Sequence, residues 1–179
     1  MATKTILNWE EFLAAGKEGH KSEWVDGEIV MMSPVNFPHE ILLARLIDCL
    51  VDFCHRHPEW LWIPSNAVFT LASGNWRCPD ASLVRKDRMP GGVIPRGRAD
   101  FAPDVAFEIL SPSDTPSQIQ RKRQDYHESG VIQVWIDPEK RIVELAQPDK
   151  PLQFFQPGKT FAISKVPDFR LDVEKLFAV

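Results

Sequence analysis

Apolar and polar positions follow two different periods along this chain. From His39 to about His57 the apolar residues keep helical spacing, which predicts a long helix that begins after Pro38. Apolar runs of strand length lie at residues 61–63, 67–71, 78–84, 105–110, 131–136 and 141–146. The pattern therefore predicts a mixed α/β domain in which helices pack on a central sheet.

The two ends of the chain carry shorter patterns. Asn8 is placed to cap a short helix over residues 9–15, and Asp26-Gly27 predicts a tight hairpin within residues 23–32. Four prolines after Gln147 interrupt short strands, and a last helical turn is expected over residues 172–177. We expect one domain over residues 1–179, with an N-terminal hairpin and a β-rich C-terminal extension.

A second helix carries a lysine on its predicted buried face. Residues 115–118 form a capping box with proline at the first helical position, and Gly130 is placed to end the helix. At 100° per residue, Ile119, Lys122 and Tyr126 fall within a sector of roughly 60°. The residues expected on other faces are Arg121, Gln124, Asp125 and Glu128. A lysine that faces inward needs a partner, because burying an unpaired charge is costly.

Two carboxylates lie on predicted strands upstream of this lysine. Asp80 is near the start of one strand, and Glu108 interrupts the apolar run of the next. An aspartate, a glutamate and a lysine in one interior site indicate a divalent-cation centre. One alternative stays open: Asp80 caps a turn, Glu108 pairs with Lys122, and no metal binds.

Composition narrows the class of protein. With 44% hydrophobic and 26% charged residues, the 179 residues fit a globular domain. Cys49, Cys54 and Cys78 are odd in number and lack CxxC spacing, which argues against disulfides and indicates a reducing compartment. The first residues lack a signal-peptide core, and no segment approaches the roughly 20 apolar residues of a membrane span. We expect a cytoplasmic protein without a membrane partner.

The net charge of −4 and the pI near 5.7 restrict any nucleic-acid-binding surface to a local patch. Residues 77–98 hold six cations against two aspartates, a local balance of +4. These cations are Arg77, Arg85, Lys86, Arg88, Arg96 and Arg98. The segment overlaps the long loop over residues 89–102, and such loops are often functional. A solvated loop without a partner is the alternative interpretation.

Several motifs, in their order and spacing, resemble the Uma2 family, a branch of the PD-(D/E)XK nuclease superfamily. They are Asp-Gly-Glu at 26–28, Met-Ser-Pro at 32–34, His39, Pro-Asp at 79–80, Glu-Ile-Leu-Ser-Pro-Ser at 108–113 and Lys122-x-x-x-Tyr126. The resemblance spans about residues 8–145 and implies a restriction-endonuclease-like fold, with a mixed central sheet flanked by helices.

The resemblance also implies a set of site residues. Asp80 and Glu108 would be ligands of Mg²⁺ or Mn²⁺, and Lys122 would be the active-site lysine. In the superfamily's usual pattern the lysine lies two residues after the glutamate, where this chain has Leu110. Lys122 must then reach the site from the next helix. We therefore expect a migrated lysine.

Three more residues are candidates for the same site. Glu23 on the hairpin would add a carboxylate, and His39 at the start of the long helix would contact a phosphate or a carboxylate. Tyr126 is expected to pack or to form a hydrogen bond rather than to catalyse. His55 and His57 lie at a helix end without a partner motif, so we expect them at the surface.

The chemistry of phosphodiester hydrolysis suits these residue types. A metal held by Asp80 and Glu108 would neutralise the charge that develops on the phosphate, and Lys122 would orient water or stabilise that charge. The sequence contains no P-loop, GxGxxG or GxSxG motif, which argues against nucleotide-dependent, dinucleotide-dependent and serine-hydrolase activities.

The first functional hypothesis is thus a metal-dependent DNA endonuclease. We expect a homodimer, because nucleases that cut both strands often pair their sites across a two-fold axis. A second hypothesis is a catalytically inactive binding or interaction module that keeps the nuclease fold. A third is a dimeric scaffold whose subunit contact uses aromatic residues: Trp135, Phe154, Phe155 and Phe161.

Overall fold

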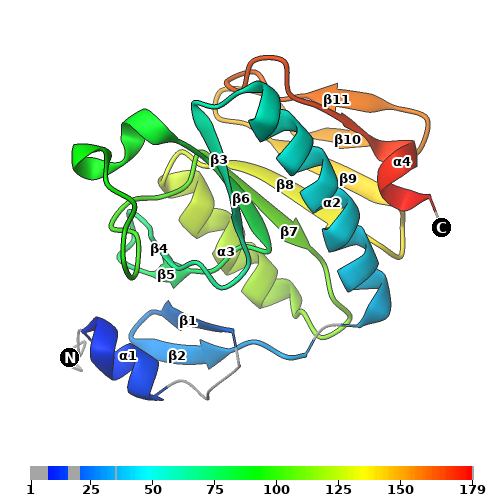
Figure 1. Cartoon of the computed structure of the whole chain (residues 1–179). Coiled ribbons are helices and arrows are strands. Elements are labelled where there is room, and N and C mark those ends of the chain that lie inside the picture. The colour runs from blue at the N-terminus through cyan, green and yellow to red at the C-terminus, as the bar shows by residue number, and fades with distance from the viewer. Residues whose placement is uncertain (1–7, 16–20, 35, 179) are drawn as a thin grey trace.

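A six-stranded mixed sheet forms the centre of the protein (Figure 1), for which a computed structural model describes residues 8–15, 21–34 and 36–178. The strand order is β10-β9-β8-β7-β6-β3. The strands are β3 (Trp60–Pro64), β6 (Ala81–Arg85), β7 (Val105–Ile109), β8 (Ile132–Asp137), β9 (Ile142–Ala146) and β10 (Gln153–Phe155). Only β7 and β8 of these pair in parallel, and the other neighbours are antiparallel.

Helix α3 (Pro116–Glu128) connects the two parallel strands, since parallel neighbours need a crossover. Its start is fixed by the predicted capping box, in which the Thr115 and Gln118 side chains each bind the other residue's backbone N–H. Its end is fixed by Gly130, whose φ of 68° suits a residue without a Cβ. Tyr126 of α3 is buried against Trp135 of the sheet. The crossover therefore covers one face of the sheet.

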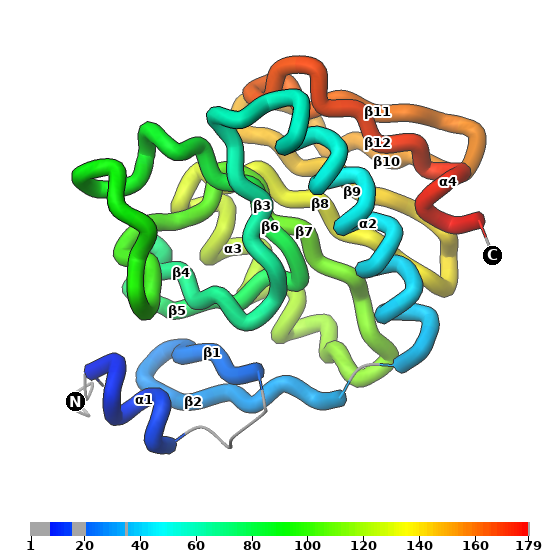
Figure 2. Tube along the Cα trace, viewed as in Figure 1, coloured from blue at the N-terminus to red at the C-terminus, as the bar shows by residue number. Residues whose placement is uncertain are grey.

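Helix α2 (Phe37–Arg56) covers the opposite face (Figure 2). The Asn36 side chain caps its first turn by accepting from the His39 N–H. Leu46, Leu50 and Phe53 are at most 1% exposed in the larger core, and burial of each such side chain stabilises the fold by about 1.5–3 kcal/mol. The C-terminal elements complete this core: β11 (Thr160–Ala162), β12 (Arg170–Asp172) and α4 (Val173–Phe177).

A smaller sheet, ordered β2-β1-β5-β4, lies beside the central one. Its strands are β1 (Ser22–Val25), β2 (Glu28–Met31), β4 (Phe69–Thr70) and β5 (Trp76–Arg77). Asp26 and Gly27 both have positive φ, as expected for the predicted tight turn. Helix α1 (Trp9–Ala15) packs on this sheet through Phe12, which meets the Trp76 ring edge-on at 5.2 Å between centroids. This sheet forms one wall of the site described below.

The predicted fold class is confirmed, and the differences lie at element boundaries. The expected strand over 78–84 is wrong in its first half, because β5 ends at Arg77 and β6 begins at Ala81. The expected strand over 67–71 shortens to Phe69–Thr70. One short 3₁₀ turn, Lys86–Arg88, directly precedes the long loop, and a second, Pro90–Gly92, lies at its start. Across the described residues, every helix is too short or too polar to cross a bilayer.

Two of the aromatic residues expected at a subunit contact lie inside the molecule. Trp135 and Phe161 are each 2% exposed, because both belong to the hydrophobic cores. Phe154 on the edge strand β10 is 60% exposed, and Phe155 is half-buried. The third hypothesis therefore loses two of its four contact residues.

Candidate functional site

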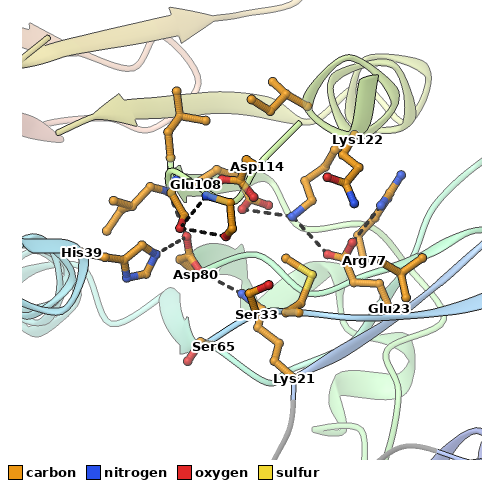
Figure 3. A pocket seen from close by; sticks show the side chains of 18 of the residues that line it. Lys21, Glu23, Ser33, His39, Ser65, Arg77, Asp80, Glu108, Asp114 and Lys122 are labelled. Carbon is orange, nitrogen blue, oxygen red and sulfur yellow. Dashed lines mark hydrogen bonds and ion pairs between the residues drawn. The ribbon is translucent and has the colours of Figure 1, made fainter. Parts of the chain in front are cut away.

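A cleft of about 630 Å³ opens between the smaller sheet, the start of α2, the end of β7 and the start of α3. Five of the six residues that sequence analysis selected for one site line this cleft: Glu23, His39, Asp80, Glu108 and Lys122. The sixth, Tyr126, is fully buried and contacts Glu108. Figure 3 shows His39 pointing toward Asp80, and Lys122 pointing between Glu23 and Glu108. Glu23, His39, Glu108 and Lys122 come from β1, α2, β7 and α3, and Asp80 from the segment between β5 and β6. The structure thus gathers residues that are up to about a hundred positions apart.

Asp80 lies between β5 and β6, where its N–H binds the Phe107 carbonyl of β7. Its Oδ2 accepts from the Ile109 N–H at 2.9 Å and lies 3.2 Å from Nε2 of His39. Its Oδ1 accepts from Lys21 Nζ at 2.8 Å. Although burial disfavours the charge, Lys21 and His39 hold the pKa of Asp80 well below its usual range. Asp80 is therefore ionised at neutral pH.

Glu108 projects from β7 into the same cleft and is 5% exposed. Its Oε1 accepts from the Tyr126 hydroxyl at 2.6 Å, and its Oε2 accepts from Lys122 Nζ at 3.3 Å. Burial raises the pKa of Glu108, with Asp80 and Glu23 adding to the shift and Lys122 opposing it. The Tyr126 contact fixes one oxygen, so Oε2 is the oxygen that faces Lys122.

Lys122 reaches the carboxylates from α3, on the face that helical periodicity predicted. Its Nζ lies 3.2 Å from Oε1 of Glu23 and 3.3 Å from Oε2 of Glu108. Burial opposes the charge, but Glu108, Glu23 and Asp80 outweigh it and raise the pKa of Lys122 above its ordinary value. The side chain is thus a permanent cation bridging two acids.

Arg77 and Asp125 extend this network into the interior. Nε and one terminal nitrogen of Arg77 donate to Asp125 Oδ2 at 2.8 and 2.6 Å, and another donates to Glu23 Oε2 at 2.7 Å. Asn75 also donates to Asp125. The expectation that Asp125 points away from the buried face is wrong: it is fully buried because the smaller sheet covers that flank of α3. Sequence reasoning missed this residue as part of the site.

Lys21 is a second lysine in the cleft that sequence analysis did not select. It directly precedes β1, lines the cleft, and donates to Asp80. Burial opposes its charge, yet Asp80 and Glu108 raise its pKa. Its distance of two residues from Glu23 was the available signal, because side chains two apart on a strand share a face.

The six cations assigned to a nucleic-acid-binding loop divide into two groups. Arg77 is 4% exposed and serves the buried network, so its guanidinium is already engaged. Arg85 ends β6, about 17 Å from Asp80 at the usual strand rise, and Lys86 and Arg88 follow it. The Arg98 guanidinium instead lies over the smaller sheet, 4.1 Å from the centre of the Trp76 ring. Three of these cations pair with nearby aspartates: Arg85 with Asp87, Arg88 with Asp104 and Arg98 with Asp100. The start of the basic segment therefore lies at the end of β6 opposite the cleft, and Arg98 lies on the smaller sheet.

The residues of the cleft fit a small divalent cation. Asp80 and Glu108 are both hard oxygen donors, and the charge of Asp80 adds to the burial effect that raises the pKa of Glu108, so the two carboxylates repel each other. A cation between them would replace this repulsion with attraction. Within the ranges that the structure describes, no cluster of three or more acidic, histidine or cysteine ligands is found. Mg²⁺ accepts such a site, because it keeps several waters and takes one or two carboxylates.

This chain is similar to solved structures of other proteins. A crystal structure described as a "putative nuclease belonging to DUF820" from Anabaena variabilis ATCC 29413 has a TM-score of 0.81 at 19% identity, with 97% of this chain and 98% of that chain covered. A "cryoEM structure DrdV-DNA complex" has a TM-score of 0.39 at 14% identity and covers 66% of this chain and 12% of that chain. No curated protein matches.

The first of these structures shows the same fold over nearly the whole length of both chains. The model of the family described as "Uma2: Putative restriction endonuclease" matches residues 9–174, which include every element that lines the cleft. The chain therefore belongs to the Uma2 family.

Proposed function

We propose that this protein is a divalent-metal-dependent endonuclease that hydrolyses phosphodiester bonds in DNA. Asp80 and Glu108 hold Mg²⁺ or Mn²⁺, and Lys122 is the active-site cation. One observation carries the proposal: in a chain of a restriction-endonuclease family, these three residues meet in a single cleft. Lys122 reaches the cleft from helix α3, because Leu110 occupies the position two residues after Glu108 that is usual for the lysine.

Each side chain has a definable part in this chemistry. A bound divalent cation would supply Lewis acidity at the phosphate and lower the pKa of a bound water. Lys122 acts as a fixed positive charge near the phosphate rather than as a general base, because its neighbours keep it protonated. Glu23 and Glu108 hold its ammonium between them, and Tyr126 orients Glu108.

The proposed partner is DNA, and the proposed assembly is a homodimer. Five cations, Arg85, Lys86, Arg88, Arg96 and Arg98, would add phosphate contacts outside the cleft. Of the late aromatic residues, Phe154 on the edge strand β10 is exposed enough to contact a second subunit.

A specific observation favours the inactive binding module as a second candidate. Lys122, Arg77 and Lys21 each already have carboxylate partners within the described structure. Such a network can hold a fold together without turnover, because buried charges persist when they are paired. The two candidates differ in whether a metal enters and a phosphodiester bond breaks.

The test is nicking of supercoiled plasmid DNA with Mn²⁺ or Mg²⁺. The parent protein should relax the plasmid, whereas Asp80→Asn and Glu108→Gln should lose activity by a factor on the order of 10² or more. Lys150→Met, in an exposed turn before β10, is the control and should cut normally. Equal cutting by all variants would place the activity elsewhere, and a parent that binds DNA without cutting it would support the binding module.

A further inference from the structure

Lys21 occupies one oxygen of Asp80. Its Nζ is 2.8 Å from Oδ1, and its side chain is 16% exposed. Oδ2 already lies within hydrogen-bond distance of the Ile109 N–H and of His39. In the part of the chain that is described, Lys21 gives the one hydrogen bond that reaches Oδ1. The oxygen that Asp80 can offer to a metal is therefore the one that Lys21 holds (Figure 3).

The two lysines of the cleft are held differently. Lys122 bridges two carboxylates and sits on a helix with defined caps at both ends. Lys21 pairs with one carboxylate and lies just outside β1, at the edge of the hairpin. Release of Lys21 breaks one ion pair, whereas release of Lys122 breaks two. Lys21 is therefore the cation that leaves more easily.

The net charge of the cleft favours the replacement of one lysine by a divalent cation. Four buried carboxylates, Glu23, Asp80, Glu108 and Asp125, form ion pairs with three buried cations, Lys21, Arg77 and Lys122. Arg121, 3.8 Å from Asp125, is matched by its own pair with Asp26, and His39 beside Asp80 is counted as neutral. A divalent cation added to this set would leave one excess positive charge. If Lys21 departs as the ion enters, the two charges of the ion and the two remaining cations balance the four carboxylates.

We infer that Lys21 and the metal exclude each other on Asp80, and that the released ammonium binds a phosphate of the substrate. This inference rests on the proposed function. The backbone of Lys21 stays in place, since its carbonyl accepts from the Met32 N–H at 2.9 Å, so a side-chain movement suffices. A phosphate that takes Lys21 frees Asp80 for the metal, and a metal that takes Asp80 frees Lys21 for the phosphate. Metal and nucleic acid consequently bind cooperatively, and this coupling is reciprocal.

The experiment measures Ca²⁺ binding by titration calorimetry, without and with a short DNA duplex, for the parent, Lys21→Met and Lys150→Met. Binding of Mg²⁺ and Mn²⁺ to the parent is measured in the same way. Without DNA, Lys21→Met should bind Ca²⁺ more tightly than the parent by a factor on the order of 10. DNA should raise the Ca²⁺ affinity of the parent and of Lys150→Met but not that of Lys21→Met. Lys21→Gln serves as a second variant if the methionine protein does not fold.

An increase in Ca²⁺ affinity distinguishes competition between Lys21 and the metal from a purely structural role of Lys21, because damage to the cleft would weaken metal binding. If both Lys21 variants bind Ca²⁺ no more tightly than the parent, the exchange is refuted, while the metal site of the proposed function stands. If the parent binds no Ca²⁺, Mg²⁺ or Mn²⁺ at all, the proposed function fails and this inference fails with it. If DNA raises the affinity of the Lys21 variants as much as that of the parent, another residue carries the coupling and the phosphate role of Lys21 is refuted.

Discussion

Lys122 lies where two acids would otherwise face each other. Glu23 and Glu108 each approach its ammonium within about 3.3 Å, and all three side chains are buried. Removing one charge of such a group leaves the others without compensation, which costs more than an exposed ion pair contributes. Changes to Lys122 should therefore affect both catalysis and stability.

Lys122→Met is predicted to lower plasmid nicking by a factor on the order of 10² or more, because a fixed charge near the phosphate is lost. It should also destabilise the fold by about 3 kcal/mol, since Glu23 and Glu108 then repel each other. Nicking rates and urea unfolding measure the two effects. Arg121 is an unsuitable control, because it lines the cleft and pairs with Asp26, so Lys150→Met takes that place. Normal nicking by Lys122→Met would exclude the lysine from the chemical step.

The lowered pKa of Asp80 should make the free energy of unfolding depend on pH. Its pKa is lowered in the fold, so its stabilising contribution is present above the unfolded pKa of about 3.9 and is lost as the pH falls toward the lower folded value. In the presence of a chelator, the parent should be more stable than Asp80→Asn by about 2–4 kcal/mol at pH 7. The gap should narrow below about pH 4. A gap that stays constant from pH 7 to pH 3 would contradict the paired, ionised state of Asp80.

At the scale of elements, Arg77 ties the smaller sheet to α3. Its strand, β5, pairs with β1 only through Trp24 and Trp76, whereas its guanidinium binds both Glu23 of β1 and Asp125 of α3. The position of Glu23 next to Lys122 therefore depends on Arg77, whose ion pairs are with Glu23 and Asp125 rather than with Asp80 or Glu108.

Arg77→Met should loosen β1 and β2 while the central sheet persists. The expected destabilisation is about 3–5 kcal/mol, because Glu23 and Asp125 are left buried without their shared partner. Hydrogen exchange should be faster at Glu23 and Val30, which pair across the hairpin two positions from the Met32–Lys21 hydrogen bond, and should stay slow in β7 and β8. Uniform loss of protection in both sheets would show that the two unfold as one unit.

Features that depend on neighbouring residues in the sequence were predictable, and features that depend on distant residues were not. The capping box and Gly130 lie within α3 itself, so its limits and the inward positions of Lys122 and Tyr126 followed from the sequence. The burial of Asp125 did not follow from the sequence, because it depends on a sheet whose residues lie about 50 positions upstream. Lys21 was missed for the same reason: its partner is 59 positions away.

At the scale of the whole molecule, the basic segment starts at Arg85, at the end of β6 opposite the cleft, and returns to the smaller sheet, where Arg98 lies over Trp76. A duplex that touches both the cleft and Arg85 must run along the direction of β6. The loop charges are largely matched by Asp87, Asp100 and Asp104, which reduces the counterions that DNA binding would release.

A triple variant with glutamine at Arg85, Arg88 and Arg98 tests the contribution of the loop. Three unpaired phosphate contacts would change the slope of log affinity against log salt concentration by about 2.7, that is, about 0.9 each. We expect a smaller change, since these cations are paired in the free protein. Fluorescence anisotropy with labelled DNA at several salt concentrations gives the slope. A change as large as 2.7 would show that the pairs open and that the loop is a main contact.

Trp135 provides an intrinsic fluorescent probe of the cleft. It is the register partner of Glu108 on the adjacent parallel strand, it lines the cleft, and the Arg123 guanidinium lies 4.5 Å from its ring centre. An ion bound by Glu108 would therefore sit close to an indole. Paramagnetic Mn²⁺ should quench the tryptophan fluorescence of Trp135 at short range, and diamagnetic Mg²⁺ should not. The difference between the two titrations should be absent in Trp135→Phe. It would report occupancy of the cleft without any added dye.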